Sequence, residues 1–259
     1  MVQQLAAETT PEIIYPDSDG QPMADNSKQF RWIVVIKENL EILFAKVDNV
    51  FIAGDMLWYP VQGNNTIRTA PDAMVVFGRP KGDRGSYKQW QEDNIPPQVV
   101  FEILSPGNRA TKMLQKTLFY QRYGVEEYYV YDPEEIELTG FTRSGDWLEP
   151  IETMNGWISP RLGIRFELKP DTLEIYRPDG QKFLTPVELD QLREQERQRA
   201  EDAIASLEQE RQRAEQESQR AEDAIASLEQ ERILREQEQQ RYQALLEQLR
   251  QRGIEPEQL

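Results

Sequence analysis

Apolar residues recur along the first two thirds of the chain in patterns that change between helical and extended spacing. After Ser27, apolar side chains return every three or four residues as far as Val47, which predicts an amphipathic helix. Short runs of β-branched, aliphatic and aromatic residues then predict four strands, with a second helix before the last of them. These strands cover residues 50–59, 73–77, 98–104 and 127–132, and the second helix covers residues 109–123.

This order of elements predicts the fold class. Helix, three strands, helix and strand together are typical of an α/β domain in which helices pack on a sheet. Residues 136–185 add short strands between Gly- and Pro-containing turns. Residues 1–25 are polar, with scattered Pro and Gly, so we expect an irregular arm before a domain that occupies residues 26–185.

The chain changes character at residue 186. The segment RAEDAIASLEQER at 199–211 returns at 220–232, an offset of 21 residues, which is three heptads. With isoleucine at the heptad a position and leucine at d, two turns of each repeat form an apolar seam, while the remaining seam positions are mostly Ala, Ser and Arg. These isoleucines and leucines are Ile204, Leu207, Ile225 and Leu228.

Residues 186–252 are therefore predicted to form a charged helix that makes a coiled coil and joins two copies of the chain. The alternative is a solitary solvated helix, supported by Glu–Arg pairs along its own surface. Residues 253–259 form the C-terminal end.

The absence of two residue types limits the chemistry. The 259 residues include no Cys and no His, which excludes disulfides, thiolate or imidazole metal ligands, and a histidine general base. Any metal must be bound through oxygen, as Mg²⁺, Mn²⁺ and Ca²⁺ are. The N-terminus has neither a basic start nor an apolar run, and no apolar stretch approaches the ~20 residues of a membrane span. We expect a cytoplasmic protein that does not enter a membrane.

The charge balance bears on possible partners. The chain carries a net charge of −16, half of it after residue 187, and an acidic protein is not generally attracted to nucleic acid. A local exception is the polar stretch 78–94, where four cations alternate with Tyr87 and Trp90, a mixture that suits phosphate contact and base stacking. The alternative is an ordinary exposed loop. The four cations are Arg79, Lys81, Arg84 and Lys88.

Two carboxylates stand where a buried strand should have none. Glu102 lies inside the apolar run VVFEIL, and a lone buried carboxylate is costly unless a cation or strong donors lie beside it. Asp72 opens the strand at 73–77, and carboxylates on neighbouring strands can converge on one divalent ion. The alternative is a structural ion pair with Arg or Lys. Lys112 and Lys116, one turn apart on the next helix, could reach the strand end.

Several tyrosines follow in the same region, and we interpret them as core and sheet packing. They are Tyr120, Tyr123, Tyr128, Tyr129 and Tyr131.

Three stretches, PDAMVVFG, VFEILSPGNR and QKTLFYQRYGVEEYYVYDP, resemble the bacterial Uma-two family of restriction-endonuclease-like proteins, a branch of the PD-(D/E)XK nuclease superfamily. The resemblance covers residues 25–170. It implies a restriction-endonuclease-like core with a mixed central sheet, and hydrolysis of DNA phosphodiester bonds with Mg²⁺ or Mn²⁺. It implies that Asp72 and Glu102 bind the metal and that Lys116 completes the catalytic set.

The sequence departs from the superfamily pattern at one position. A lysine usually follows the glutamate by two residues, and Leu104 stands there in this chain. The resemblance implies that the lysine has moved to the next helix as Lys116, with Lys112 as the fallback. The first helix of the superfamily often adds an acidic residue, for which Glu38 and Glu41 are candidates.

Asp55, on the first predicted strand, is a further candidate for the site. The expected function is a metal-dependent endonuclease whose tail joins it into a homodimer. The alternative is a catalytically silent scaffold that acts through the coiled coil.

Overall fold

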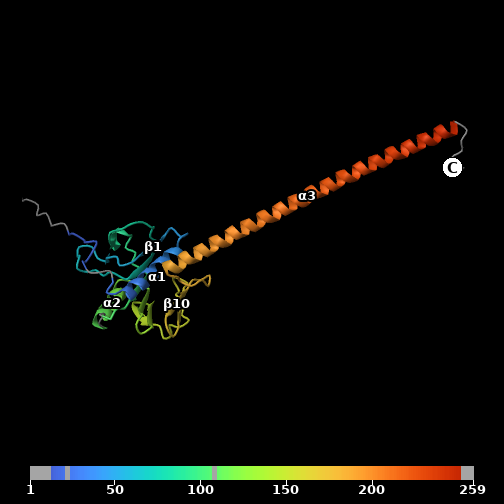
Figure 1. Ribbon diagram of the computed structural model, residues 1–259. Helices are drawn as coiled ribbons and strands as arrows, with labels where there is room; N and C mark the ends of the chain where they lie inside the picture. Colours follow the sequence, from blue (N-terminus) through green and yellow to red (C-terminus); the bar gives the residue numbers. More distant parts are fainter. Residues whose placement is uncertain (1–12, 21–23, 107–109, 252–259) are drawn as a thin grey trace, which may run out of the picture. The chain divides into compact units, whose positions relative to one another are not determined.

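A six-stranded mixed sheet forms the centre of the body (Figure 1). The structure is a computed structural model that describes residues 13–20, 24–106 and 110–251. Strands β5 and β6 pair in parallel, and the other neighbours in this sheet are antiparallel. This confirms the predicted α/β class with a mixed central sheet. In spatial order the strands are β1 (Val50–Ala53), β3 (Ala73–Phe77), β5 (Val99–Ile103), β6 (Glu127–Asp132), β7 (Glu137–Ser144) and β8 (Trp147–Pro150).

Two helices cover the two faces of this sheet. Helix α1 (Ser27–Leu43) begins at Asn26, whose side-chain oxygen accepts hydrogen bonds from the backbone N–H groups of the first turn at 3.0 and 2.8 Å. It packs against β1, β3 and β5. Helix α2 (Ala110–Arg122) connects β5 to the parallel strand β6 and packs its apolar side chains on the opposite face.

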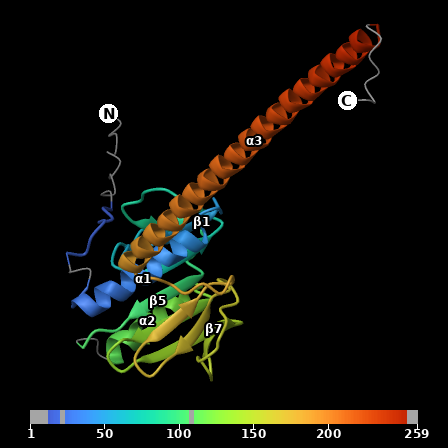
Figure 2. The same ribbon diagram turned by 45° about the vertical axis from the view of Figure 1, so that its right-hand side comes forward.

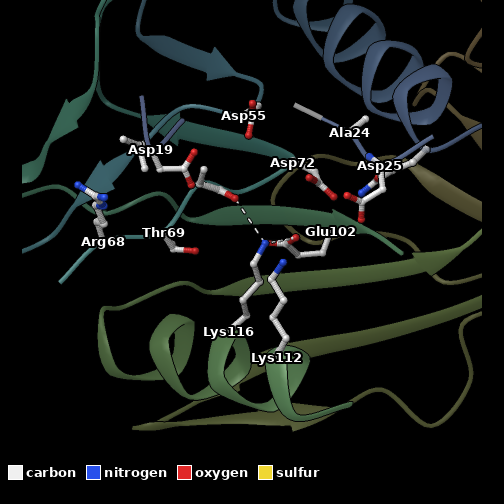
Figure 3. Close-up of a pocket in the computed structure, with 13 residues that line it drawn as sticks. Asp19, Ala24, Asp25, Asp55, Arg68, Thr69, Asp72, Glu102, Lys112 and Lys116 are labelled. Carbon is white, nitrogen blue, oxygen red and sulfur yellow. Dashed lines mark hydrogen bonds and ion pairs between the residues drawn. The ribbon is translucent and has the colours of Figure 1, made fainter. Parts of the chain in front are cut away.

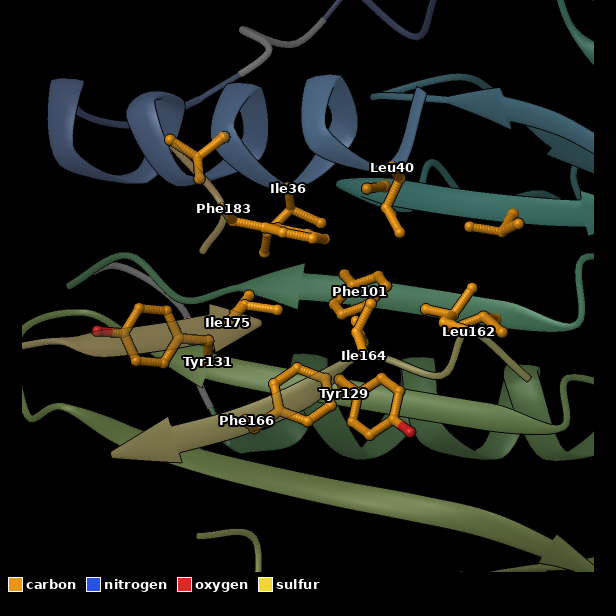
Figure 4. Close-up of a cluster of buried hydrophobic side chains, with 14 of the residues drawn as sticks. Ile36, Leu40, Phe101, Tyr129, Tyr131, Leu162, Ile164, Phe166, Ile175 and Phe183 are labelled. Atoms are coloured by element: carbon orange, nitrogen blue, oxygen red, sulfur yellow. The ribbon is translucent and has the colours of Figure 1, made fainter. Parts of the chain in front are cut away.

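The central strands are apolar on both faces because both faces are covered. Val75 and Phe101 belong to the core cluster on the α1 face, together with Ile36 and Leu40 of that helix. Figure 4 shows Phe101, Ile36 and Leu40 in this cluster. Alternate residues point the other way, so Val100 belongs to the cluster on the α2 face. The even-numbered residues of β5 therefore face α2.

A smaller sheet closes the core on the α1 side. Strands β9 (Arg165–Leu168) and β10 (Leu173–Tyr176) pair in an antiparallel manner. Phe166 from β9 packs 4.8 Å from the ring of Tyr129 on β6. Strands β9 and β10 thus extend the same hydrophobic core rather than form a separate layer.

The predicted strand at 50–59 is two strands. The backbone turns after β1 at Asp55, which has a φ of 48° and donates its N–H to the Pro71 carbonyl at 3.0 Å. The second piece, β2 (Trp58–Tyr59), pairs in parallel with β4 (Tyr87–Lys88), which precedes a short 3₁₀ helix (Gln89–Gln91). The stretch expected to be a polar loop therefore contributes a strand. Its Tyr87 side chain is fully buried.

Helix α3 (Pro186–Gln251) is one continuous helix of 66 residues, about 100 Å long (Figure 2). It begins with a capping box in which Thr185 and Glu188 bond to each other's backbone N–H groups at 3.2 and 2.7 Å. None of its residues is buried, and its seam residues Ile204 and Leu207 are 67% and 65% exposed.

The chain divides into two compact units, Met1–Leu189 and Asp190–Leu259. The coiled coil stays a prediction, and the expected C-terminal end at 253–259 lies outside the described residues. In the part of the chain that the structure covers, no helix is both long enough and apolar enough to pass through a bilayer.

The core on the α1 face predicts unequal effects of two leucine truncations. Leu40→Ala removes a fully buried side chain and should lower the free energy of unfolding by about 2–5 kcal/mol. Leu114→Ala removes a side chain that is 60% exposed on α2, so it should change that free energy by less than about 0.5 kcal/mol. Urea denaturation followed by circular dichroism measures both, and equal losses would contradict the position of this core.

Candidate active site

Two carboxylates meet across β3 and β5. Ala73 pairs with Phe101, and the next position of the same register sets Asp72 opposite Glu102. Residues directly opposite in antiparallel strands have Cβ atoms about 4.5–5.5 Å apart. Asp72 Oδ2 also accepts the backbone N–H of Ile103 at 2.6 Å. Both carboxylates are buried on the face that α2 covers.

Helix α2 supplies the partners of Glu102. The Lys116 ammonium lies 2.5 Å from Glu102 Oε2 and 3.4 Å from the Ala70 carbonyl oxygen. The Tyr120 hydroxyl donates to the other carboxylate oxygen, Oε1. Residues 116 and 120 are one helical turn apart and share a face, so one helix holds both oxygens of a carboxylate that is 3% exposed. This arrangement satisfies the charge that the sequence identified as anomalous.

A cavity of about 330 Å³ opens over these groups (Figure 3). Among the described residues, its lining has five carboxylates and three cations, so these residues have two more negative than positive formal charges. The carboxylates are Asp19, Asp25, Asp55, Asp72 and Glu102. The cations are Arg68, Lys112 and Lys116.

The excess of negative charge appears in the acid–base behaviour of the cavity. Burial, followed by repulsion from Glu102, raises the pKa of Asp72 to about 8. Burial and the neighbouring Asp19 raise the pKa of Asp55 to about 6. Burial alone would lower the pKa of Lys116, but Glu102 and Asp72 outweigh it and raise that pKa, so the ammonium stays charged. An added cation would therefore stabilise the ionised carboxylates.

The donor set fits Mg²⁺ or Mn²⁺. Asp72 and Glu102 offer oxygen atoms only, which these ions prefer. Within the described ranges, no three acidic residues lie close enough together to hold a metal without other ligands. Mg²⁺ in enzymes commonly takes one or two carboxylates and fills its remaining positions with water and substrate phosphate. A site of two carboxylates in an acidic cavity suits that pattern.

The structure separates the additional candidates into two groups. Asp55 and Lys112 line the same cavity as Asp72 and Glu102. Glu38 and Glu41 do not line it, and both pair instead with Lys37, at 3.0 and 3.8 Å. Helix α1 reaches the cavity through Gln29, whose side chain donates to the Ile103 carbonyl at 2.8 Å. The expected acidic contribution from the first helix is thus not brought to this cavity.

The cations of the stretch 78–94 have intramolecular partners. Arg79 and Arg84 both pair with Glu92, at 2.8 and 2.7 Å. The Lys81 ammonium donates to the carbonyls of residues 44 and 45 at 2.7 and 2.9 Å. Lys88 lies 5.9 Å from the ring of Tyr15. Among the residues that the structure describes, none of these four lines the cavity, so they stabilise the fold of this segment rather than surround the carboxylates.

An N-terminal segment lines the cavity, which the sequence did not predict. Tyr15 packs against Tyr59 at 5.2 Å and Trp90 at 4.9 Å, and the Tyr59 hydroxyl donates to the Pro16 carbonyl at 2.7 Å. These contacts anchor the segment that carries Asp19. Tyr15, an aromatic residue in an arm of mostly polar residues, is the sequence feature that could have indicated these contacts.

The sequence also did not assign three further groups to the site, namely Asp25, Arg68 and the hydroxyl of Tyr120. Asp25 accepts a hydrogen bond from Ser105, and Arg68 donates to the Tyr59 hydroxyl at 3.3 Å. Tyr120 is buried as expected of a core residue, yet its hydroxyl is directed at Glu102.

Comparisons with known proteins bear on this site. The chain is similar to a solved structure described as a putative nuclease belonging to DUF820 from Anabaena variabilis. The two share 15% identity with a TM-score of 0.40, and the likeness covers 52% of this chain and 72% of that chain. So loose a likeness transfers no residue. No curated protein matches the chain. A family model described as "Putative restriction endonuclease" matches residues 4–169. Because this match spans more than half of the chain, the protein belongs to the Uma2 family.

Proposed function

We propose that this protein is a metal-dependent endonuclease that hydrolyses DNA phosphodiester bonds at the cavity beside α2. The observation that supports this most directly is the meeting of Asp72 and Glu102 across β3 and β5, with the Lys116 ammonium 2.5 Å from Glu102. The family's description as restriction endonuclease agrees with such a reaction. When bound by the two carboxylates, Mg²⁺ would supply a water of lowered pKa and positive charge beside the phosphate.

The protein groups have distinct parts in this proposal. Asp72 is kept in place by the Ile103 N–H, and Glu102 by Lys116 and Tyr120. These contacts fix the positions of both carboxylates at the cavity. Lys116 is a charged donor at the same point, and its ammonium would stabilise the negative charge that develops on the phosphate. Lys112, on the same face of α2, lines the cavity as a second cation.

The tail has a separate part in the proposal. Residues 26–185 would carry the site, and residues 186–252 would pair two copies of the chain through the seam of α3. The support is the row of exposed isoleucines and leucines at heptad spacing, which water would otherwise surround. Two joined sites could act on two separate segments of a substrate.

The second candidate function is a scaffold that works through α3 alone. The exposed seam of α3 supports it equally. The cavity favours the enzyme instead, because a scaffold needs no buried carboxylates opposed at close range, an arrangement that raises the pKa of Asp72 to about 8.

Removing either ligand carboxylate should abolish cleavage. Asp72→Asn and Glu102→Gln should lower plasmid nicking with Mg²⁺ or Mn²⁺ by about 10²-fold or more. Asp72→Asn should leave the thermal unfolding midpoint unchanged or higher, because the amide oxygen can still accept the Ile103 N–H and no ionisable group then faces Glu102. Mn²⁺ should raise that midpoint for the parent protein and not for Asp72→Asn.

The matched control is Asp146→Asn, which changes an exposed carboxylate outside this cavity and should retain activity and the Mn²⁺ response. Equal nicking by the parent protein and both ligand variants would contradict the assigned site.

Tyr120→Phe tests whether the hydroxyl on Glu102 positions a ligand. Loss of this donor should weaken Mn²⁺ binding and cleavage by about 10- to 100-fold, because such partners orient metal-binding groups. Tyr123→Phe, one turn along, is the control: its ring packs on Phe119, and it should leave both quantities unchanged. Unchanged Mn²⁺ affinity in Tyr120→Phe, measured by calorimetry, would limit Tyr120 to core packing.

The pairing of two chains predicts the mass in solution. Light scattering should give a dimer for the full chain and a monomer for a chain that ends at Leu189. Leu207→Glu should also give a monomer, because it places a charge in the seam. Gln209→Glu adds the same charge away from the seam and should remain dimeric. A monomeric full chain would rule out pairing through α3.

A further inference from the structure

The carboxylates of the candidate site lie at the bottom of a small recess. Asp72 is 7% exposed and Glu102 is 3% exposed. The cavity of about 330 Å³ is at the small end of the range for pockets that take small molecules, with room for roughly one nucleotide. A phosphate that reaches these groups must enter the recess. In an intact duplex, each phosphate is held on a stiff outer surface beside base-paired neighbours.

Different parts of the chain wall this recess. The N-terminal segment contributes Asp19, the connection between β2 and β3 contributes Arg68 and Thr69, and α2 contributes Lys112 and Lys116 (Figure 3). The recess has room for roughly one nucleotide, so a second strand cannot enter it together with the first. A single strand can turn a phosphate inward, because its backbone is flexible.

The N-terminal wall is anchored at several points. The Tyr15 hydroxyl accepts the Gly63 N–H at 2.6 Å, and the Ser86 hydroxyl donates to Asp17 at 3.0 Å. Asp17 also lies where a Cβ on Gly85 would be, so the segment packs closely against the loop before β4. These contacts keep the wall in place and oppose its displacement by a duplex.

The described residues at the site carry few cations for a duplex. Proteins that bind duplex DNA commonly neutralise 6–10 phosphates. Among the described residues, the cavity lining offers three cations, Arg68, Lys112 and Lys116, and Arg79 and Arg84 do not line it. Three contacts suit a short single-stranded segment. They predict a slope of about −2 when log affinity is plotted against log salt concentration. A duplex held by 6–10 contacts would give a slope of about −5 to −9.

We propose that the substrate is a single-stranded or locally unpaired nucleic-acid segment, one nucleotide of which enters the recess beside α2. This inference rests on the proposed nuclease function and specifies its substrate class.

The test compares one fluorescently labelled oligonucleotide in three forms, with the full chain and Mg²⁺ or Mn²⁺. The forms are the single strand, the same strand annealed to its complement, and a duplex with a single-stranded overhang. The single strand should be cut at least about 10-fold faster than the duplex, since a base of the duplex must first be unpaired. Cuts in the third substrate should fall in the overhang, and single-strand affinity should follow the salt slope of about −2.

A duplex cut as fast as the single strand would overturn this inference and leave the proposed function intact. No cleavage of any form with either ion would overturn both.

Tyr15→Ala tests the wall directly, because it loosens the segment without altering a residue assigned to the site. It should reduce the preference for single strands at least threefold by raising the relative rate on duplex. Tyr242→Ala, an exposed tyrosine of α3, is the control and should keep the parent preference. An unchanged preference in Tyr15→Ala would overturn the role of the N-terminal segment as the excluding wall.

Discussion

The burial of the Glu102 carboxylate within a central strand is the constraint on which the candidate site depends. A buried charge without partners would destabilise the fold by several kcal/mol, and both oxygens of this one are bonded by α2 through Lys116 and Tyr120. The topology makes this possible. Because β5 and β6 are parallel, the chain must cross over the sheet between them, and the crossover helix lies on the face toward which Glu102 points.

The charges around Glu102 affect both the stability of the fold and the chemistry that the cavity can perform. The body and the tail are both acidic, the cavity itself has an excess of carboxylates, and the loop cations have partners within the fold. Long-range attraction of a polyanion is therefore weak. In the proposed function, a divalent cation and the described cations that line the cavity compensate the charge of the phosphate at close range. Burial and repulsion from Glu102 together raise the pKa of Asp72, and that cation would relieve the repulsion, which relates the charge of the recess to its proposed use.

Much of the site could be predicted from the sequence because it breaks local rules. A glutamate in the run VVFEIL needs a partner whatever the topology, and an aspartate at the start of the neighbouring strand needs the same. Helical spacing set Lys112 and Lys116 on one face, and Leu104 excluded the strand itself as the source of a cation. The order of helices and strands likewise predicted the α/β class, since each element's periodicity is visible in a short window.

The tertiary structure decided the residues that reach the cavity from far along the chain. The N-terminal segment lies there because Tyr15 packs on Tyr59 and Trp90, contacts that no local pattern encodes. Glu38 lies outside the cavity and pairs with Lys37 on its own helix. The sequence by itself determined the elements and the buried charges that needed partners, because periodicity and desolvation act locally. Only the fold decided which distant side chains surround those charges, because that depends on how strands and crossover are ordered in space.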